Sequence, residues 1–341
     1  MERIKSNFTP VEYDPQYILM VNHLKKYFPI KGGMVSHTIG HVKAVDGVTF
    51  NLKRGTTMGL VGESGCGKTT TGRTILRLAG EKTDGQVLFN GKEVYDIPNK
   101  EMRELRTKMQ IIFQDPFSSL DPKKTVSQTI AEPIIENKIL KDKKAIDARV
   151  RELMATVGLA ERLVNAYPHE LDGGRRQRIG IARALAMEPK FIVCDEPVSA
   201  LDVSIQAQIL NLLQELKEQM GLTFIFITHD LSVVNHFADE IAVMYLGQLI
   251  EKAPTEELFD HPVHPYTRAL LSAIPIPEVG IERPERILLR GEISSPIDPP
   301  DECRFAKRCY YVCDQCHKSC PQLVEISEGH FVSCHLWENF K

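Results

Sequence analysis

The fold is decided by residues 57–70, which read Thr57-Met-Gly-Leu-Val-Gly-Glu-Ser-Gly-Cys-Gly-Lys-Thr-Thr70. A short apolar run leads into a glycine-rich loop, and residues 71–78 then have helical spacing. Residues 62–69 fit the pattern G-x-x-x-x-G-K-[ST], which is specific when it joins a strand to a helix. The stretch therefore predicts a phosphate-binding loop.

The chemistry of such a loop is simple. Its glycines let backbone N–H groups curl around an anion, and the following helix adds partial positive charge at its first turn. We expect Lys68 to reach the β- and γ-phosphates of a nucleotide and the Thr69 hydroxyl to bind Mg²⁺. Cys66 lies beside Lys68, which favours a lowered thiol pKa, although phosphoryl transfer needs no thiol. The expected nucleotide-binding residues are Gly62, Glu63, Ser64, Gly65, Cys66, Gly67, Lys68, Thr69 and Thr70.

A second carboxylate site follows an apolar strand at residues 191–196, Phe-Ile-Val-Cys-Asp-Glu. Asp195 is expected to hold Mg²⁺ and Glu196 to polarise the attacking water. Taken alone, two acids that end a strand can be merely solvated polar residues. His229 ends a later apolar run and is a candidate for contact with the γ-phosphate, or else a simple polar terminus.

The remaining pattern predicts an α/β fold. Residues 191–194 and 222–227 are continuously apolar, as strands of a parallel sheet covered on both faces must be. Residues 17–93 alternate short apolar stretches with turn signals, which indicates a strand-rich layer. Helical spacing is found at residues 147–166, 175–187 and 204–220, so that a helical insertion follows Gln114.

Composition sets limits on function. A length of 341 residues suggests about two domains, and 43% apolar with 26% charged residues is typical of a globular protein. A net charge of -3 does not favour nucleic acid as the main partner. No apolar run approaches the roughly 20 residues that span a bilayer, and the first residues lack a secretory hydrophobic stretch, so we expect a cytosolic chain.

These motifs together resemble the ATPase subunits of ABC transporters, and they run in that family's order. They are Walker A at 62–69, the Q-loop residue Gln114, the signature at 171–177, Walker B at 191–196, the D-loop at 199–202 and the H-loop residue His229. The resemblance implies a P-loop NTPase core with an antiparallel β layer. It implies Lys68, Gln114, Glu196 and His229 as catalytic residues, and Thr69, Gln114 and Asp195 as Mg²⁺ ligands. Phe28, with Tyr27 as the other candidate, would stack on adenine.

A narrower resemblance, to the oligopeptide/dipeptide importer ATPases, rests on residues 27–33, 43–47, 112–122 and 264–275. Beyond about Lys252 proline becomes frequent and periodicity fades, which places a domain boundary there. Together with this boundary, the resemblance implies an ABC ATPase domain at 1–255, with a helical subdomain at about 115–180, and a C-terminal extension at 256–341. It also implies a paralogous ATPase partner in a heterodimer, two membrane permease subunits and an external peptide-binding protein. The chain would be peripheral, at the cytoplasmic face of the membrane, without nucleic acid.

Other functions stay open at this point. Nickel importers share much of the narrower pattern, so the solute could be nickel or another small molecule. A soluble ABC protein acting on ribosomes or DNA usually carries two cassettes or a long coiled-coil insertion, and this chain has neither. A nucleotide-binding module without hydrolysis is disfavoured by the intact acidic pair Asp195 and Glu196.

The signature departs from the family's L-S-G-G-Q, because the chain reads Leu171-Asp-Gly-Gly-Arg175. In the family this motif faces the γ-phosphate on the partner's loop, where Asp172, Gly173, Gly174 and Arg175 would lie. An ionised Asp172 would repel the γ-phosphate, because two like charges about 4 Å apart repel by roughly 4 kcal/mol at an effective dielectric of about 20. We therefore expect an asymmetric pair of sites; in the alternative, local charges compensate and both sites hydrolyse ATP.

Six of the eight cysteines lie between Cys303 and Cys334. The set Cys303, Cys309, Cys316 and Cys334 has a spacing similar to that of importer ATPases, where it resembles a four-thiolate [4Fe-4S] site. Zn²⁺ is an alternative, since Cys313 and Cys316 form a C-x-x-C pair, and free thiols are a third reading. We expect an iron–sulfur cluster with a structural role.

Overall fold

The computed structural model describes residues 8–32, 37–274 and 286–340. Gly33 and residues 275–285, which include the last residue of the importer-like segment 264–275, lie outside the described residues. The chain divides into two compact units, one of residues 1–53, 57–96 and 228–341 and one of residues 54–56 and 97–227. The predicted boundary after residue 255 stays a prediction, since these units follow spatial contacts rather than chain order.

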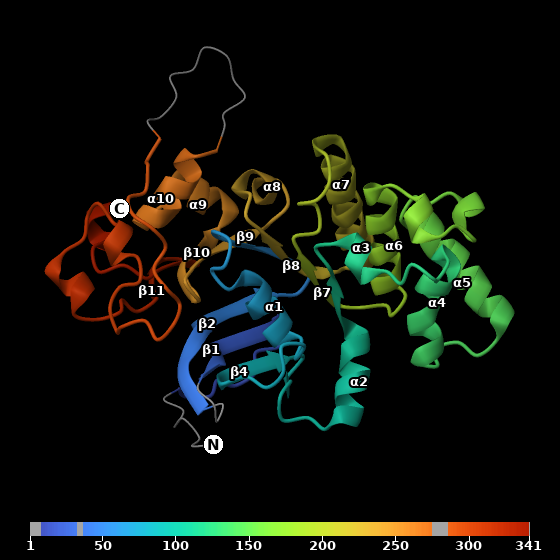
Figure 1. The fold of residues 1–341 in the computed structure, drawn as a ribbon, viewed down its shortest axis with the longest axis horizontal. Helices are drawn as coiled ribbons and strands as arrows, with labels where there is room; N and C mark the ends of the chain where they lie inside the picture. The colour runs from blue at the N-terminus through green and yellow to red at the C-terminus, as the bar shows by residue number, and fades with distance from the viewer. Residues whose placement is uncertain (1–7, 33–36, 275–285, 341) are drawn as a thin grey trace, which may run out of the picture. The chain divides into compact units, whose positions relative to one another are not determined.

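The first unit contains the predicted antiparallel β layer, drawn in blue and teal in Figure 1. Strand β1 pairs with β2 on one side and β4 on the other, and β4 pairs with β5, all antiparallel. Alternation of buried and exposed residues along β2 fits a layer with one covered face. The bounds are β1 Tyr17–Gly32, β2 His37–Lys53, β4 Asp84–Phe89 and β5 Lys92–Glu93.

A second sheet in the same unit carries the phosphate loop. Strand β3 is buried at all five positions and pairs in parallel with β9, and β10 and β12 continue the sheet in antiparallel order to the hairpin strand β11. The bounds are β3 Thr57–Val61, β9 Glu240–Tyr245, β10 Gln248–Pro254, β11 Val324–Ser327 and β12 His330–Val332. The helices of this unit are α1 Lys68–Ile75, α8 Leu231–Asn235, α9 Thr255–Asp260 and α10 Pro265–Ser272, with 3₁₀ turns at Ala306–Arg308, Asp314–His317 and Trp337–Phe340.

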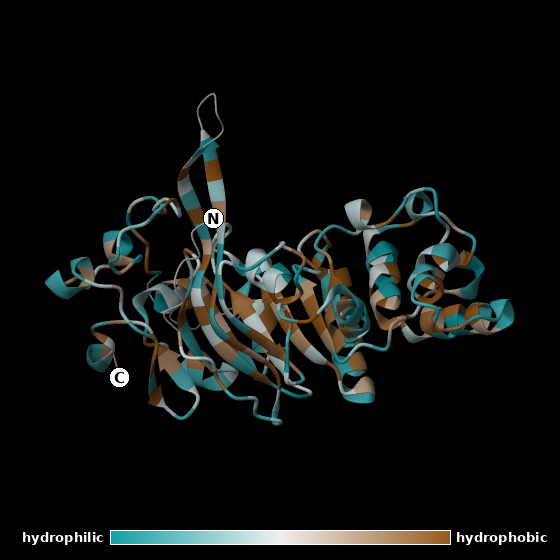
Figure 2. Cartoon of the chain, turned by 90° about the horizontal axis from the view of Figure 1, so that it is seen from below, coloured by the Kyte–Doolittle hydropathy of each residue, from teal (hydrophilic) through white to brown (hydrophobic). Residues whose placement is uncertain are grey.

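In the second unit, parallel strands alternate with helices along the chain. Strands β6, β7 and β8 pair in parallel, which confirms the prediction made from the continuous apolar runs of β7 and β8. In Figure 2 the sheet strands are predominantly brown, whereas helices carry brown and teal residues side by side. The bounds are α2 Asn99–Lys108, β6 Met109–Ile112, α3 Pro116–Ser119, α4 Val126–Glu136, α5 Lys143–Thr156, α6 Gly173–Leu185, β7 Phe191–Asp195, α7 Val203–Met220 and β8 Thr223–Thr228, with 3₁₀ turns at Glu161–Leu163 and Pro168–Glu170.

Local caps explain where these helices begin. Thr125 and Gln128 form a capping box at α4, and Asp142 and Asp202 cap α5 and α7 through their carboxylates. One predicted helix was too long, because α5 ends at Thr156 and not near residue 166. Its last carbonyls accept from the N–H groups of the residues that follow, since Gly158 has a left-handed φ of 69° and bonds the Ala155 carbonyl at 3.0 Å.

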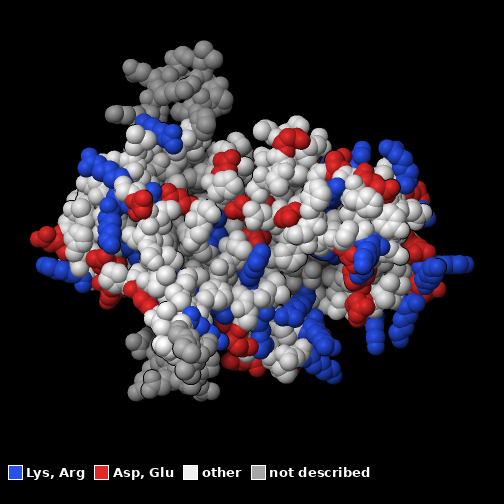
Figure 3. Space-filling model, in the orientation of Figure 1, with Lys and Arg blue, Asp and Glu red and all other residues white. Residues whose placement is uncertain are grey.

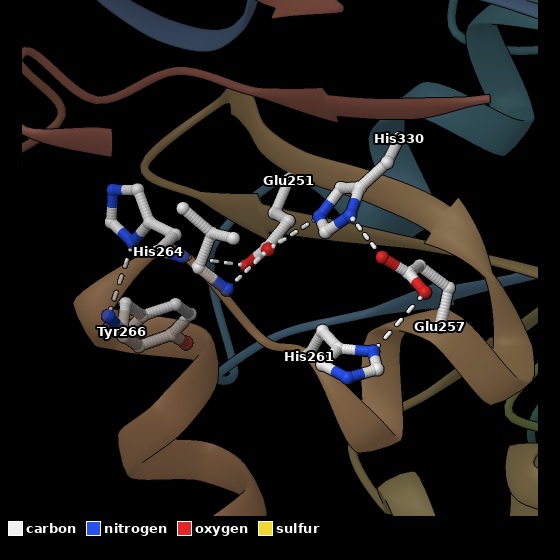
Figure 4. A network of polar contacts seen from close by, with 7 residues as sticks. Glu251, Glu257, His261, His264, Tyr266 and His330 are labelled. Atoms are coloured by element: carbon white, nitrogen blue, oxygen red, sulfur yellow. Dashed lines mark hydrogen bonds and ion pairs between the residues drawn. The ribbon is translucent and has the colours of Figure 1, made fainter. Parts of the chain in front are cut away.

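The C-terminal hairpin is attached through a buried ion pair (Figure 4). His330 Nε2 lies 2.9 Å from Glu251 Oε1, and the two side chains are 1% and 0% exposed. The other ring nitrogen lies 3.4 Å from Glu257. Burial opposes a positive charge on His330, but the hydrogen bonds and charges of Glu251 and Glu257 outweigh it and raise its pKa. Hairpin and sheet are therefore joined by charge as well as by backbone pairing.

Surface charge is mixed. Figure 3 shows Lys, Arg, Asp and Glu side chains interspersed over the face drawn, in keeping with the small net charge of -3. No helix within residues 8–32, 37–274 and 286–340 has the length and apolar character needed to cross a membrane.

We expect His330→Gln to lower the free energy of unfolding by about 3 kcal/mol at pH 6, because the buried Glu251 carboxylate would lose its cationic partner. The His330 contribution is fully present below its unfolded pKa of about 6.5 and is lost as pH rises through the raised folded pKa. The difference between variant and parent should therefore shrink at pH 9. Urea denaturation at both pH values measures it.

The matched control is His261→Gln, since His261 pairs with Glu257 at 3.2 Å but its side chain is 72% exposed. That change should alter stability by less than about 1 kcal/mol. A His330→Gln protein as stable as the parent at pH 6 would show that the pair does not hold the hairpin.

Candidate functional site

The phosphate loop lies between β3 and α1, as the sequence predicts. Lys68 is 4% exposed. Its ammonium donates to the Gly62 carbonyl at 2.7 Å and the Glu63 carbonyl at 3.1 Å. The loop backbone thus holds the predicted phosphate-binding cation in place.

Two glycines make the loop sterically possible. Gly62 has φ 148° and a Cβ there would lie 2.3 Å from the Met244 carbonyl oxygen; Gly67 has φ 107° and a Cβ there would lie 2.2 Å from the Ala44 oxygen. Gly65, in contrast, faces open space. Helix α1 begins after Gly67 without a side-chain cap, so that its first turn is available to an anion. Loop and helix therefore fit the phosphates of a nucleotide.

The pKa of the Cys66 thiol differs from the prediction, which was a lowered value. Burial raises the pKa of its thiol, and the nearby Lys68 ammonium, 3.9 Å away, only opposes that effect. The helix N-terminus and Lys68 favour the thiolate, but a thiol that is 4% exposed loses most of its solvation. Cys66 is a buried neutral side chain beneath the loop.

Glu63 has partners that the sequence did not predict. Its backbone N–H donates to the Tyr266 hydroxyl at 2.9 Å, and its two carboxylate oxygens accept from Arg308 at 2.7 and 3.0 Å. These residues lie 203 and 245 positions further along the chain. No local spacing could have revealed these two partners, because they contact the loop only in the folded chain.

In the second unit the structure brings Gln114 and Glu196 together. The amide nitrogen of Gln114 donates to Glu196 Oε2 at 3.0 Å. Asp195 ends β7 and is 1% exposed. Glu196 has φ 48°, which is uncommon for a residue with a side chain, and its N–H donates to the Ile227 carbonyl at 3.0 Å. Glu196 is half-buried where Asp195 is buried, and the roles of both acids stay predictions.

Asp172, the residue at which the signature departs from the family pattern, caps a helix. The Asp172 carboxylate caps α6 by accepting from the Arg175 N–H at 2.8 Å, and Arg175 Nη1 lies 3.5 Å from its other oxygen. Gly173 and Gly174 lie close to D-loop and α7 side chains, since a Cβ would meet Leu201 at 3.0 Å and Ile205 at 2.6 Å. Ser and Asp are similarly good N-caps, so that the exchange keeps the helix start and changes its charge.

Two further residues of the predicted site, His229 and Phe28, are exposed. His229 follows β8 at the surface of the first unit. Of the two aromatic candidates, Phe28 is 39% exposed, whereas the Tyr27 hydroxyl donates to Asp46 and its ring is half-buried. Phe28 is the better placed of the two for stacking, and both assignments remain predictions.

The predicted iron–sulfur cluster is wrong. Among the described residues no group of three or more His, Cys, Asp or Glu side chains is placed to hold a metal ion, and this also removes the Zn²⁺ alternative. Burial raises the pKa of Cys303 to about 12 and of Cys334 to about 11. The cysteines Cys303, Cys309, Cys313, Cys316, Cys320 and Cys334 are free.

The chain is similar to known families and proteins along most of its length. Residues 45–199 match the family described as "ABC transporter", and residues 250–316 match "Oligopeptide/dipeptide transporter, C-terminal region". The chain is 49% identical to the oligopeptide transport ATP-binding protein AppF of Bacillus subtilis, over 94% of this chain and 97% of that protein. It is 50% identical to the oligopeptide transport ATP-binding protein OppF of Escherichia coli, over 93% and 95%.

Solved structures agree on the fold. A component of the ABC transporter complex cbiONQ of Clostridium perfringens is similar with a TM-score of 0.62 and 30% identity, covering 72% of this chain and 91% of that one. An ATP-binding cassette in a dimeric, post-hydrolysis state with ADP and phosphate has the same TM-score and 29% identity, covering 70% and 98%.

The fold and its motifs define an ATP-binding cassette ATPase, in which ATP and Mg²⁺ are the expected ligands. The chain belongs to the oligopeptide/dipeptide branch of the ABC transporter ATP-binding proteins. Mg²⁺ supplies charge neutralisation of the β- and γ-phosphates in this chemistry. In this chain the phosphates would lie at the loop, and the orientation of water by Glu196 stays a prediction.

We expect Gly67→Ala to weaken Mg-ATP binding at least tenfold, because a Cβ 2.2 Å from the Ala44 oxygen must displace the loop. Isothermal titration of the full-length chain measures this. Gly221→Ala is the matched control, since Gly221 also has a left-handed φ of 62° but a Cβ there meets nothing within 4 Å. Unchanged affinity in Gly67→Ala would refute the assigned loop geometry.

Proposed function

We propose that the chain is the ATP-hydrolysing subunit that energises import of oligopeptides or dipeptides across the cytoplasmic membrane. The observation that carries this proposal is about 50% identity to oligopeptide transport ATP-binding proteins along nearly the whole chain, together with the transporter-type C-terminal region. The subunit would lie peripherally on the cytoplasmic face, beneath two membrane permease subunits that receive peptide from an external binding protein.

Coupling would use residues of both units. ATP binds at the phosphate loop, Glu196 polarises the attacking water, and Gln114, which contacts Glu196 at 3.0 Å, reports the state of that site. The helices that follow Gln114, α3 to α6, would pass the movement to the membrane subunits. The contact between Gln114 and Glu196 supports this route, because it joins the acid to the start of the helical segment.

We expect a bacterial strain without this chain to lose uptake of labelled oligopeptides and to regain it with the parent chain but not with Lys68→Met. Lysine at this position carries the phosphate contact, and methionine keeps its length without its charge. Radiolabelled tri- and tetrapeptides measure uptake, with nickel uptake beside them. Loss of nickel uptake and not of peptide uptake would contradict the peptide assignment.

We also propose an asymmetric heterodimer with a paralogous ATPase. The site built on Lys68, Asp195, Glu196 and His229 would hydrolyse ATP once the partner supplies a signature serine. The opposite site would receive Asp172, whose ionised carboxylate accepts but does not donate hydrogen bonds. Arg175, 3.5 Å from Asp172 and about half exposed, offsets only part of that charge.

In the assembled transporter, Glu196→Gln should reduce ATP turnover at least tenfold, because the remaining site is the slow one. Adding Asp172→Ser should then raise turnover, since serine keeps the N-cap of α6 and removes the charge. Glu188→Gln is the control, as Glu188 shares the left-handed backbone (φ 49°) of Glu196 (φ 48°) outside the site. Near-normal turnover in Glu196→Gln would end the idea of asymmetry.

A further inference from the structure

The C-terminal region contributes two side chains to the second residue of the phosphate loop. Arg308 donates to both carboxylate oxygens of Glu63, a two-bond geometry that fixes direction as well as distance. The Tyr266 hydroxyl accepts the Glu63 N–H at 2.9 Å. Glu63 is thus held at its backbone and at its side chain by residues that no phosphate-loop pattern contains.

Both partners are themselves rigid. Arg308 is 8% exposed and Tyr266 is fully buried. Phe305, three residues before Arg308, packs edge-on against Tyr245 and Tyr266, with ring centroids 5.3 and 5.5 Å apart. An ion pair whose arginine is locked in this way loses little side-chain entropy, unlike an exposed pair.

Tyr266 is fixed through the polar network in Figure 4. Its N–H donates to His264 Nδ1 at 3.1 Å, and the Glu251 carboxylate accepts the Val263 and His264 N–H groups at 2.8 and 3.0 Å. Glu251 also binds His330 at 2.9 Å. The start of α10 is therefore anchored to β10 and to the C-terminal hairpin, and it presents the Tyr266 hydroxyl to the loop.

The position of Glu63 matters because its carbonyl is part of the loop's own bonding. That carbonyl accepts from the Lys68 ammonium at 3.1 Å and from the Cys66 N–H at 3.2 Å. A shift of the Glu63 peptide would move both the cation and an amide of the predicted phosphate cradle. Small displacements of this kind are costly where preorganised donors bind an anion.

We propose that Tyr266 and Arg308 are positioning residues of the nucleotide site, which hold Glu63 so that the phosphate loop is preformed before ATP binds. The C-terminal region is then a working part of the ATP site as well as an appended segment. This proposal rests on ATP binding by the family and is independent of the transported solute.

The test is Mg-ATP affinity of the full-length chain, with kcat and KM of the assembled transporter. Arg308→Gln should raise Kd and KM about tenfold and Tyr266→Phe about fivefold, the size of a charged and a neutral hydrogen bond, with kcat changed less than twofold. Glu63→Gln should raise Kd and KM as much as Arg308→Gln does. The double variant that combines Glu63→Gln with Arg308→Gln should bind Mg-ATP no more weakly than either single variant. Arg308→Lys, which keeps the charge, should restore part of the affinity.

Matched controls separate positioning from general stability. Tyr310→Phe removes a hydroxyl that bonds the Leu288 carbonyl in the same region, and Arg290→Gln removes an arginine that stacks on Tyr310. Thr125→Ala weakens the capping box of α4 and so destabilises the chain away from the loop. All three should keep the parental affinity. Parental affinity in both Arg308→Gln and Tyr266→Phe, additive effects in the double variant, or an equal loss in Thr125→Ala would overturn the proposal.

Discussion

The backbone of the phosphate loop runs so close to two carbonyl oxygens that no side chain fits at its first or third glycine. The oxygens belong to Met244 on β9 and Ala44 on β2, so the sheet and the antiparallel layer both shape the loop. Contacts of this kind fix a backbone more firmly than side-chain packing, since neither partner can rotate away. Other elements of the first unit support this close contact between the loop backbone and the two carbonyl oxygens.

The C-terminal region is one of these supports. A short extension without its own core would gain folding energy from a cluster, which is the reason for expecting one. The structure instead gives it a place on the core of the first unit. Phe305 packs against buried tyrosines, Arg304 binds Asp46 and the Leu246 carbonyl, and His330 pairs with Glu251. Buried aromatic area and paired charge therefore attach this region to the first unit.

Sequence reasoning succeeded where function and local structure use the same residues. The strand, loop and helix around Lys68 follow from one continuous stretch, and the apolar runs of β7 and β8 specify a parallel sheet. It failed where distant contacts decide. Cys66 is governed by burial rather than by Lys68, and cysteine spacing does not reveal whether the thiols converge. Glu63 has its partners more than 200 positions away, beyond any periodicity.

Asp172 shows why one position can obey structural rules and break a chemical one. At the start of α6 its carboxylate accepts the Arg175 N–H at 2.8 Å, as a serine oxygen would, so that helix formation does not oppose the exchange. A phosphate across a dimer interface would distinguish the two, because serine donates a hydrogen bond and an ionised carboxylate repels. Selection for folding alone would then tolerate the change. In the heterodimer that we propose, one competent site would be enough, and Asp172 would slow the other site while leaving the start of its helix intact.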